Sequence, residues 1–128
     1  MKKNKLSFLK TLFIGLLFSS CHQPKNIDGI WSDENGSTIK EAYASFYQKG
    51  DSVFMHHFLI FKDTPFFEFG KGIRKKDSLI YTVSVRYDGP KWGNKTGVHR
   101  LKIKENKLEG IYITNGKKGA LVFTKKGY

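Results

Sequence analysis

The fold is decided by the stretch Leu79-Ile80-Tyr81-Thr82-Val83-Ser84-Val85-Arg86-Tyr87. Its odd-numbered residues are all apolar, and three of the four residues between them are polar. Successive side chains of a β-strand point to opposite faces, so a spacing of two predicts a strand with one buried face. The sequence therefore predicts a β-strand from Leu79 to Tyr87.

The same rhythm extends in both directions, with turn residues about every ten positions, as expected for a sandwich or barrel. Asn115-Gly116 is a strong tight-turn signal, because both residues tolerate a positive φ. In the second predicted strand, Glu41 to Ser45 is also compatible with a helix. The predicted strands are a first one carrying Ile27, Gly29 and Trp31, then Thr38–Gln48, Ser52–Phe61, Phe66–Arg74, Leu79–Tyr87, Val98–Lys104, Lys107–Thr114 and Gly119–Lys125.

Eight strands joined by hairpin-length links favour an all-β fold, an antiparallel up-and-down barrel formed by residues 27–128. Closure removes exposed strand edges and leaves an interior that side chains fill or that holds one small ligand. No link is long enough for a helical crossover, so a parallel sheet is not expected. Aromatic residues make up 15% of the chain, including 11 Phe, and supply the core. The single cysteine excludes an internal disulfide.

The first 20 residues have the features of a secretion signal. Lys2, Lys3 and Lys5 form a basic start, and the apolar stretch Leu12–Phe18 follows. That stretch is shorter than the ~20 apolar residues that span a bilayer. The chain is therefore predicted to be exported, with residues 1–20 as the signal peptide.

The segment Leu17-Phe18-Ser19-Ser20-Cys21 resembles the lipobox of bacterial lipoproteins, with Phe18 where that family prefers Leu. The resemblance implies cleavage before Cys21 and lipidation of its thiol, with residues 21–26 as a lipidated tether. His22 is not the Asp of an inner-membrane retention signal, so we expect an outer-membrane anchor facing the periplasm. The alternatives are a secreted protein with a free Cys21, or an uncleaved membrane helix.

The formal net charge is +12; four lysines lie in the signal, so 19 basic and 11 acidic residues remain, a net charge of +8. In a protein tethered to a membrane, such a charge favours lipid head groups and anionic envelope polymers as partners over nucleic acid. Solubility alone is the other explanation of the charge.

The pattern Gly29-Ile30-Trp31 resembles the opening of lipocalin-like and avidin-like barrels. Gly29 would let a neighbouring strand pass closely, and Trp31 would plug the barrel end. The resemblance to avidin-like barrels extends to Thr38 and places that family's ligand-contacting serine at Ser37, but Asp33 replaces its Asn. It implies the fold and does not imply biotin as the ligand.

Two further stretches are candidate binding sites. The longest loop, from Asp88 to Gly97, carries Trp92 beside lysines, which suits a sugar or an anionic head group. Alternatively, Trp92 folds back as a lid on the core. In Val53–Phe61 both faces are apolar, so one face fills the barrel and the other needs a cover, such as a partner, the lipid surface or the rest of the chain. The candidate ligand-binding residues are Trp31, Ser37, Tyr43 and Trp92.

No catalytic or metal-binding constellation emerges from the sequence. His56 and His57 are strand neighbours that point to opposite faces, and Asp33 is interpreted as a turn former. We therefore expect no enzyme activity, no cofactor and no metal. The predicted function is a lipid-anchored, non-catalytic barrel that binds a small apolar or amphipathic ligand. The alternative is a module that docks an envelope partner through a basic or aromatic surface.

Overall fold

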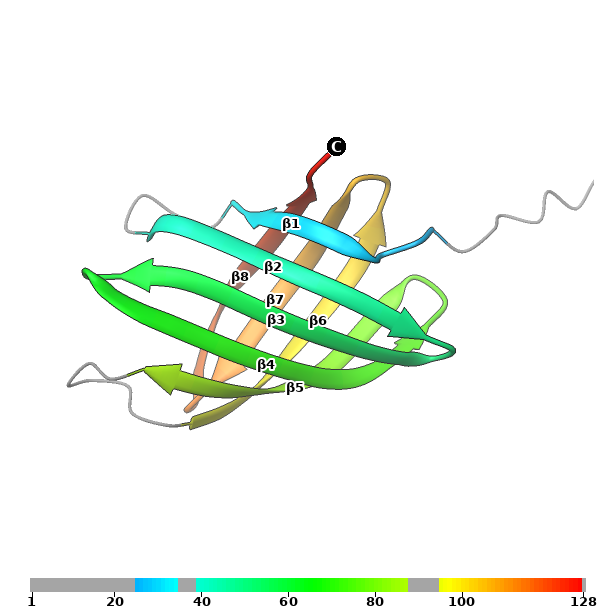
Figure 1. Ribbon diagram of the computed structural model, residues 1–128. Coiled ribbons are helices and arrows are strands. Elements are labelled where there is room, and N and C mark those ends of the chain that lie inside the picture. The colour runs from blue at the N-terminus through cyan, green and yellow to red at the C-terminus, as the bar shows by residue number, and fades with distance from the viewer. Residues whose placement is uncertain (1–24, 35–38, 88–94, 128) are drawn as a thin grey trace, which may run out of the picture.

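The computed structural model describes residues 25–34, 39–87 and 95–127. Eight strands form a closed, antiparallel, up-and-down barrel in which each strand pairs with its sequence neighbours and β1 pairs with β8 (Figure 1). The prediction of an all-β, eight-stranded barrel is confirmed. The strands are β1 Gly29–Asp33, β2 Ile39–Lys49, β3 Ser52–Phe61, β4 Thr64–Lys75, β5 Ser78–Tyr87, β6 Lys95–Lys104, β7 Lys107–Thr114 and β8 Lys117–Lys125.

The alternation that predicted the strands also sets which side chains face inward. In β5 the predicted apolar set is buried throughout. The helical alternative for Glu41 to Ser45 is wrong, because these residues lie in β2 and pair with β3. The predicted loop from Asp88 to Gly97 is too long, since β6 already begins at Lys95, which pairs with Val85.

Tight turns with left-handed residues join the strands. Asn115 and Gly116 have φ values of 56° and 73°, as the sequence predicted. Lys62 and Asp63 form the β3–β4 turn with φ values of 48° and 62°. Paired positive φ values give the turn a twist that matches the right-handed twist of the flanking strands, so these turns fix the strand register.

The two ends of the barrel differ. We call the end that carries residues 25–28 and the β2–β3, β4–β5 and β6–β7 turns the tether end, and the opposite end the far end. Ile27 and Trp31 are fully buried near the tether end, and the Trp31 Nε1 donates a 2.9 Å hydrogen bond to the Ile27 carbonyl. Gly29 is required there by its φ of 128°, a conformation that residues with a side chain rarely adopt. Space is not the reason, since the nearest atom to an added Cβ would be 3.6 Å away. The predicted close strand passage is therefore not the reason for this glycine.

A buried arginine fixes the start of the described chain at the tether end. Arg74 donates from Nη1 to the Lys25 carbonyl at 2.7 Å and to the Gln48 side chain at 3.0 Å. Lys125 donates from Nζ to the Asn26 carbonyl at 2.8 Å. These bonds hold residues 25 and 26 against the ends of β2, β4 and β8.

Between the tether end and the middle of the barrel, the core consists of aromatic side chains in contact with one another. Phe46 makes edge contacts with Trp31, Tyr81 and Phe123 at centroid distances of 5.7 to 6.0 Å. Gly70 leaves room for this packing, because a Cβ at that position would meet the Tyr81 ring at 2.8 Å. The inward faces of β1 and of β3 to β6 also carry polar side chains, and these form the candidate site.

Candidate functional site

Four ionisable side chains from four strands lie inside the barrel. They are Asp33 of β1, His57 of β3, Glu68 of β4 and His99 of β6, with side chains between 1% and 8% exposed. Each occupies an inward position of its strand's alternation: His57, for example, lies between the buried Met55 and Leu59. The strand period therefore places them in the core, although charged groups are rarely buried without a partner.

The groups contact one another in a row, which we call the polar row: Asp33, His57, Glu68, His99 and Tyr81. His57 donates from Nδ1 to Glu68 Oε2 at 2.8 Å, and its Nε2 lies 3.2 Å from Asp33 Oδ2. Glu68 Oε1 lies 3.7 Å from His99 Nε2. His99 Nδ1 and the Tyr81 hydroxyl share a 3.2 Å hydrogen bond. The row thus crosses the interior and connects five strands.

The contacts reverse the effect of burial on two pKa values. Burial alone lowers the pKa of the His57 imidazole, but Asp33 and Glu68 outweigh it and raise that pKa from 6.5 to about 9. Burial alone raises the pKa of Glu68, but His57 and His99 outweigh it and lower that pKa from 4.5 to about 2. Near neutral pH, His57 is therefore an imidazolium and Glu68 a carboxylate. Burial, followed by the nearby carboxylates, raises the pKa of Tyr81 well above its usual value.

One polar atom of the row is incompletely satisfied. His57 Nε2 is buried and faces Asp33 Oδ2 at 3.2 Å as an ion pair, without a well-directed hydrogen bond. A group that accepts from this N–H and donates to a carboxylate would complete the network, and a hydroxyl does both.

His57 lies near the middle of β3 and Glu68 lies nearer the far end of β4, whereas Tyr81 lies nearer the tether end of β5. Leu59, Phe66 and Tyr87 are the neighbouring inward residues on the far-end side of the polar row, and Phe66 and Tyr87 are in ring contact at 5.6 Å. On β2, the inward residues beside them are the small Ala42 and Ala44. Apolar aromatic surface followed by polar groups is the composition of a site for an amphipathic molecule.

The predicted site residues are distributed over the molecule and do not come together. Trp31 is buried near the tether end, with Lys125 Nζ 5.5 Å above its ring. Tyr43 is 47% exposed on the outer face of β2, so it does not line the interior. Cys21, Ser37 and Trp92 lie outside the described residues.

The prediction that His56 and His57 point to opposite faces is confirmed, but the sequence did not show that His57 would form part of a site. His56 is exposed on the outer face and His57 is buried inside. The interpretation of Asp33 as a turn former is wrong, because it belongs to β1 and its side chain is 2% exposed beside His57. Glu68 and His99 carried a usable signal, since each is a polar residue at an inward position of an alternating strand.

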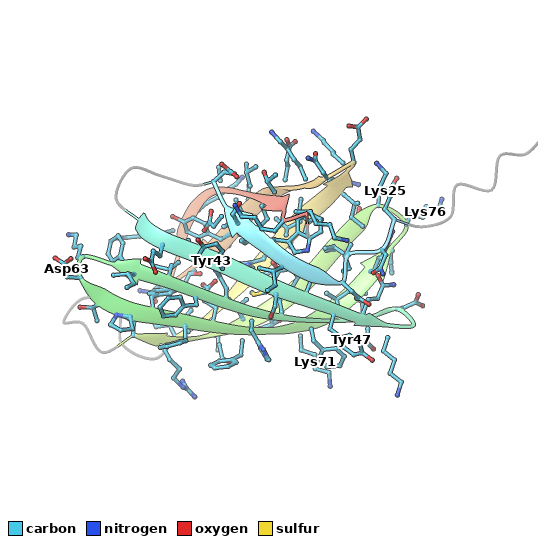
Figure 2. The ribbon with its side chains drawn as sticks, turned by 45° about the horizontal axis from the view of Figure 1, so that its top comes forward. Lys25, Tyr43, Tyr47, Asp63, Lys71 and Lys76 are labelled. Carbon is cyan, nitrogen blue, oxygen red and sulfur yellow. The ribbon has the colours of Figure 1, made fainter. Side chains whose placement is uncertain are left out.

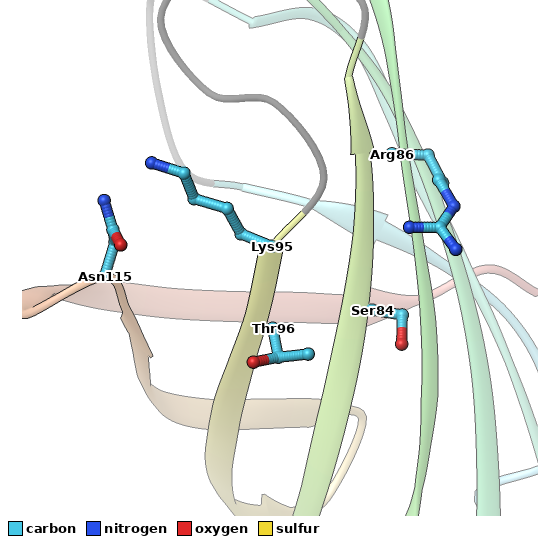
Figure 3. Close-up of a pocket in the computed structure, with 5 residues that line it drawn as sticks. All are labelled: Ser84, Arg86, Lys95, Thr96 and Asn115. Atoms are coloured by element: carbon cyan, nitrogen blue, oxygen red, sulfur yellow. The ribbon is translucent and has the colours of Figure 1, made fainter.

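An open groove of about 490 Å³ lies beside the ends of β5 and β6 (Figure 3). It is lined by Ser84, Arg86, Lys95, Thr96 and Asn115. Two cations beside two hydroxyls and an amide suit an anionic or hydroxylated ligand. Its wide opening to solvent provides little enclosure, so the polar row remains the stronger candidate.

Within residues 25–34, 39–87 and 95–127, no three His, Cys, Asp or Glu side chains are grouped so as to hold a metal ion. The same part of the chain contains no helix of sufficient length and hydrophobicity to cross a membrane. Comparison of the chain with known protein families, curated proteins and solved structures finds no match.

Proposed function

We propose that this chain is a lipid-anchored envelope protein whose barrel binds a small amphipathic ligand without catalysis. The hydroxyl of the ligand would lie against His57 and the carboxylates of the polar row. Its apolar part would lie toward the far end, against Phe66 and Tyr87. The observation that carries this proposal is the buried His57 Nε2, which faces Asp33 at 3.2 Å without a well-directed hydrogen bond.

The charge state of the row favours binding over acid–base catalysis. A catalytic acid or base works best when its pKa lies near the working pH. The pKa of His57 is raised to about 9 and that of Glu68 is lowered to about 2, so neither gains or loses a proton readily near neutrality. Preorganised charges of this kind orient a polar head group instead.

The proposed anchor is compatible with this binding site. Arg74, itself bonded to Gln48, holds the Lys25 carbonyl at the tether end, while the apolar part of the proposed site lies toward the far end. A lipid on Cys21, four residues before Lys25, would therefore leave the far end accessible. Labelling with radioactive palmitate tests the anchor: the parent should take up label and Cys21→Ala should not. Equal label in both would refute the anchor.

Titration with octanol tests the binding site, because octanol pairs a hydroxyl with an alkyl chain. We expect saturable shifts of the His57 imidazole signals in NMR spectra, and weaker ones with octyl methyl ether, which cannot donate. Glu68→Gln should weaken octanol binding roughly tenfold, the effect of one charge-assisted hydrogen bond. His56→Gln, on the outer face, is the matched control. Octanol shifts that are absent, or unchanged in Glu68→Gln, would refute the proposed site.

A further inference from the structure

The outer surface of β2 to β5 is unusually apolar for a strand face that points to solvent. Its large apolar residues are between 42% and 55% exposed. We call this surface the outer aromatic face and define it by Tyr43, Tyr47, Phe67, Phe69, Ile73 and Ile80. Antiparallel sheets normally present polar side chains on the face that is not packed, so this composition needs an explanation.

The face is continuous across the strands because the register places its members side by side. Tyr43 is paired with Phe58, which is paired with Phe67, and the Phe58 and Phe67 rings lie 5.1 Å apart. Tyr47 stacks on Phe54 at 6.2 Å. Ring contacts between neighbouring strands hold the side chains in place, so the face exists before any partner binds.

The opposite wall of the barrel does not share this composition. The outward positions of β6 include the exposed Arg100, Lys102 and Lys104. On β8, which belongs to this opposite wall, Ala120 is also exposed on the outer surface. Among the described residues, the large apolar side chains that are 41% to 55% exposed all lie on β2 to β5 except Ile30, which is paired with Ser45 of β2. The large outward apolar residues of the opposite wall are less exposed, so the strongly exposed ones gather on one side, which is the pattern of a docking face.

Three lysines of β4 and the turn after it lie within the outer aromatic face or at its border near the tether end. Lys71 lies within it, with Nζ 5.8 Å from the Phe54 ring, and projects beside Tyr47 (Figure 2). Lys75 and Lys76 are exposed where β4 ends. Tyrosines and lysines around an apolar patch are typical of the membrane–water interface, where ring bodies lie among the lipids and polar ends stay hydrated.

The start of the described chain lies at the tether end, in contact with β4, a strand of this face, and with β8 of the opposite wall. Arg74 of β4, which follows Ile73 of the face in sequence, donates a hydrogen bond to the Lys25 carbonyl. A segment attached to a membrane through residue 21 would therefore keep the tether end, including the end of β4, close to the lipid surface. The position of the tether and the charge of the border both favour lipid over a second protein.

We propose that the outer aromatic face docks on the surface of an anionic lipid bilayer, with the barrel lying on its side. The tyrosine and phenylalanine rings enter the head-group region, and Lys71, Lys75 and Lys76 pair with lipid phosphates. This proposal depends on the proposed lipid anchor only in one respect: the anchor would bring the outer aromatic face close to the membrane. Each lysine near an anionic surface strengthens binding about fivefold.

The test uses the full chain with an environment-sensitive NBD fluorophore on a new cysteine, in vesicles of phosphatidylethanolamine and phosphatidylglycerol. Phe69→Cys places the probe on the face, and Ala120→Cys places it on the opposite wall as the matched control. We expect lipids spin-labelled near the head group to quench the probe at 69 and to leave the probe at 120 unchanged. Lys71→Glu should reduce quenching at 69, and vesicles of phosphatidylcholine alone should do the same.

The outcomes separate docking from the anchor. Chain that floats with vesicles while the probe at 69 stays unquenched overturns the docking alone, and a protein partner would then be the better occupant of the face. Equal quenching at 69 and 120 also overturns it, because the orientation would be random. Quenching confined to 69 in a chain that takes up no palmitate supports docking and refutes the anchor.

Discussion

The ion pair between His57 and Glu68 gives the protein a pH-dependent stability whose size follows from the two pKa values. The pKa of His57 is about 9 in the folded protein against 6.5 for an ordinary histidine. At ~1.4 kcal/mol for each tenfold difference, this corresponds to roughly 3 kcal/mol. The low pKa of Glu68 reports largely the same pair, so its contribution is not added again.

The direction of each effect fixes the pH window. Because its folded pKa is raised, His57 stabilises the fold fully below pH 6.5 and loses that contribution as the pH rises to about 9. Because its folded pKa is lowered, Glu68 stabilises the fold above pH 4.5 and loses that contribution as the pH falls to about 2. The contribution of the pair is therefore largest between pH 4.5 and 6.5.

Glu68→Gln is the perturbation that tests this reasoning, because glutamine keeps the volume and an acceptor oxygen but removes the charge. We expect the free energy of unfolding at pH 6 to fall by ~3 kcal/mol, since one partner of a buried pair is lost. The deficit should shrink as the pH approaches 9, where the parent loses its imidazolium. Urea unfolding at several pH values, followed by tryptophan fluorescence, measures it.

The matched control is His56→Gln on the outer face, which should leave the pH dependence of unfolding unchanged. NMR titration of the imidazoles should give a pKa of about 9 for His57 in the parent and a lower value in Glu68→Gln. If the parent and Glu68→Gln lose stability equally between pH 6.5 and 9, the ion pair does not set the pKa of His57 and the argument is wrong.

Two further substitutions test the packing of the barrel. Trp31→Phe removes the hydrogen bond to the Ile27 carbonyl and should lower the free energy of unfolding by ~1–3 kcal/mol in urea unfolding, because the buried acceptor is left unpaired. Gly110→Ala would place a Cβ 1.8 Å from the Arg100 carbonyl oxygen, so it should destabilise the fold by ~3 kcal/mol or more, whereas Gly127→Ala, with nothing within 4 Å, should have no effect in the same thermal melt. Unchanged stability in either of the first two variants would contradict the packing described for it.

The sequence was sufficient for the strands because their alternation is local. Leu79 to Tyr87 and the Asn115-Gly116 turn each carry their signal within a few residues, and both predictions are confirmed. The start of β6 was missed because Gly97 resembles a loop residue. Its actual role is packing: an added Cβ would meet Thr114 Oγ1 at 2.3 Å.

The polar row could not be predicted in the same way because its partners are distant in sequence. His57 and Glu68 are directly opposite on β3 and β4, but His99 reaches them only after the barrel has closed. Asp33 begins the run Asp33-Glu34-Asn35-Gly36, whose residue types favour a turn, so the local sequence does not indicate its inward position. The inward placement of His57, Glu68 and His99 was predictable from the alternation of each strand. The contacts that offset the cost of burying them depend on how the strands are paired in the closed barrel.

The cost of the polar row is itself an argument about function. Replacing a buried ion pair with apolar residues of similar volume is often neutral or stabilising by ~1–4 kcal/mol, so stability alone does not require the row. Specifying the register is a second use of buried charge, but Lys62 and Asp63 already fix the pairing of β3 with β4 through their turn. His57 and Glu68 therefore add little register information. The proposed binding would give the row a use, because a ligand hydroxyl would complete the contacts of His57 Nε2, which faces Asp33 at 3.2 Å without a well-directed hydrogen bond.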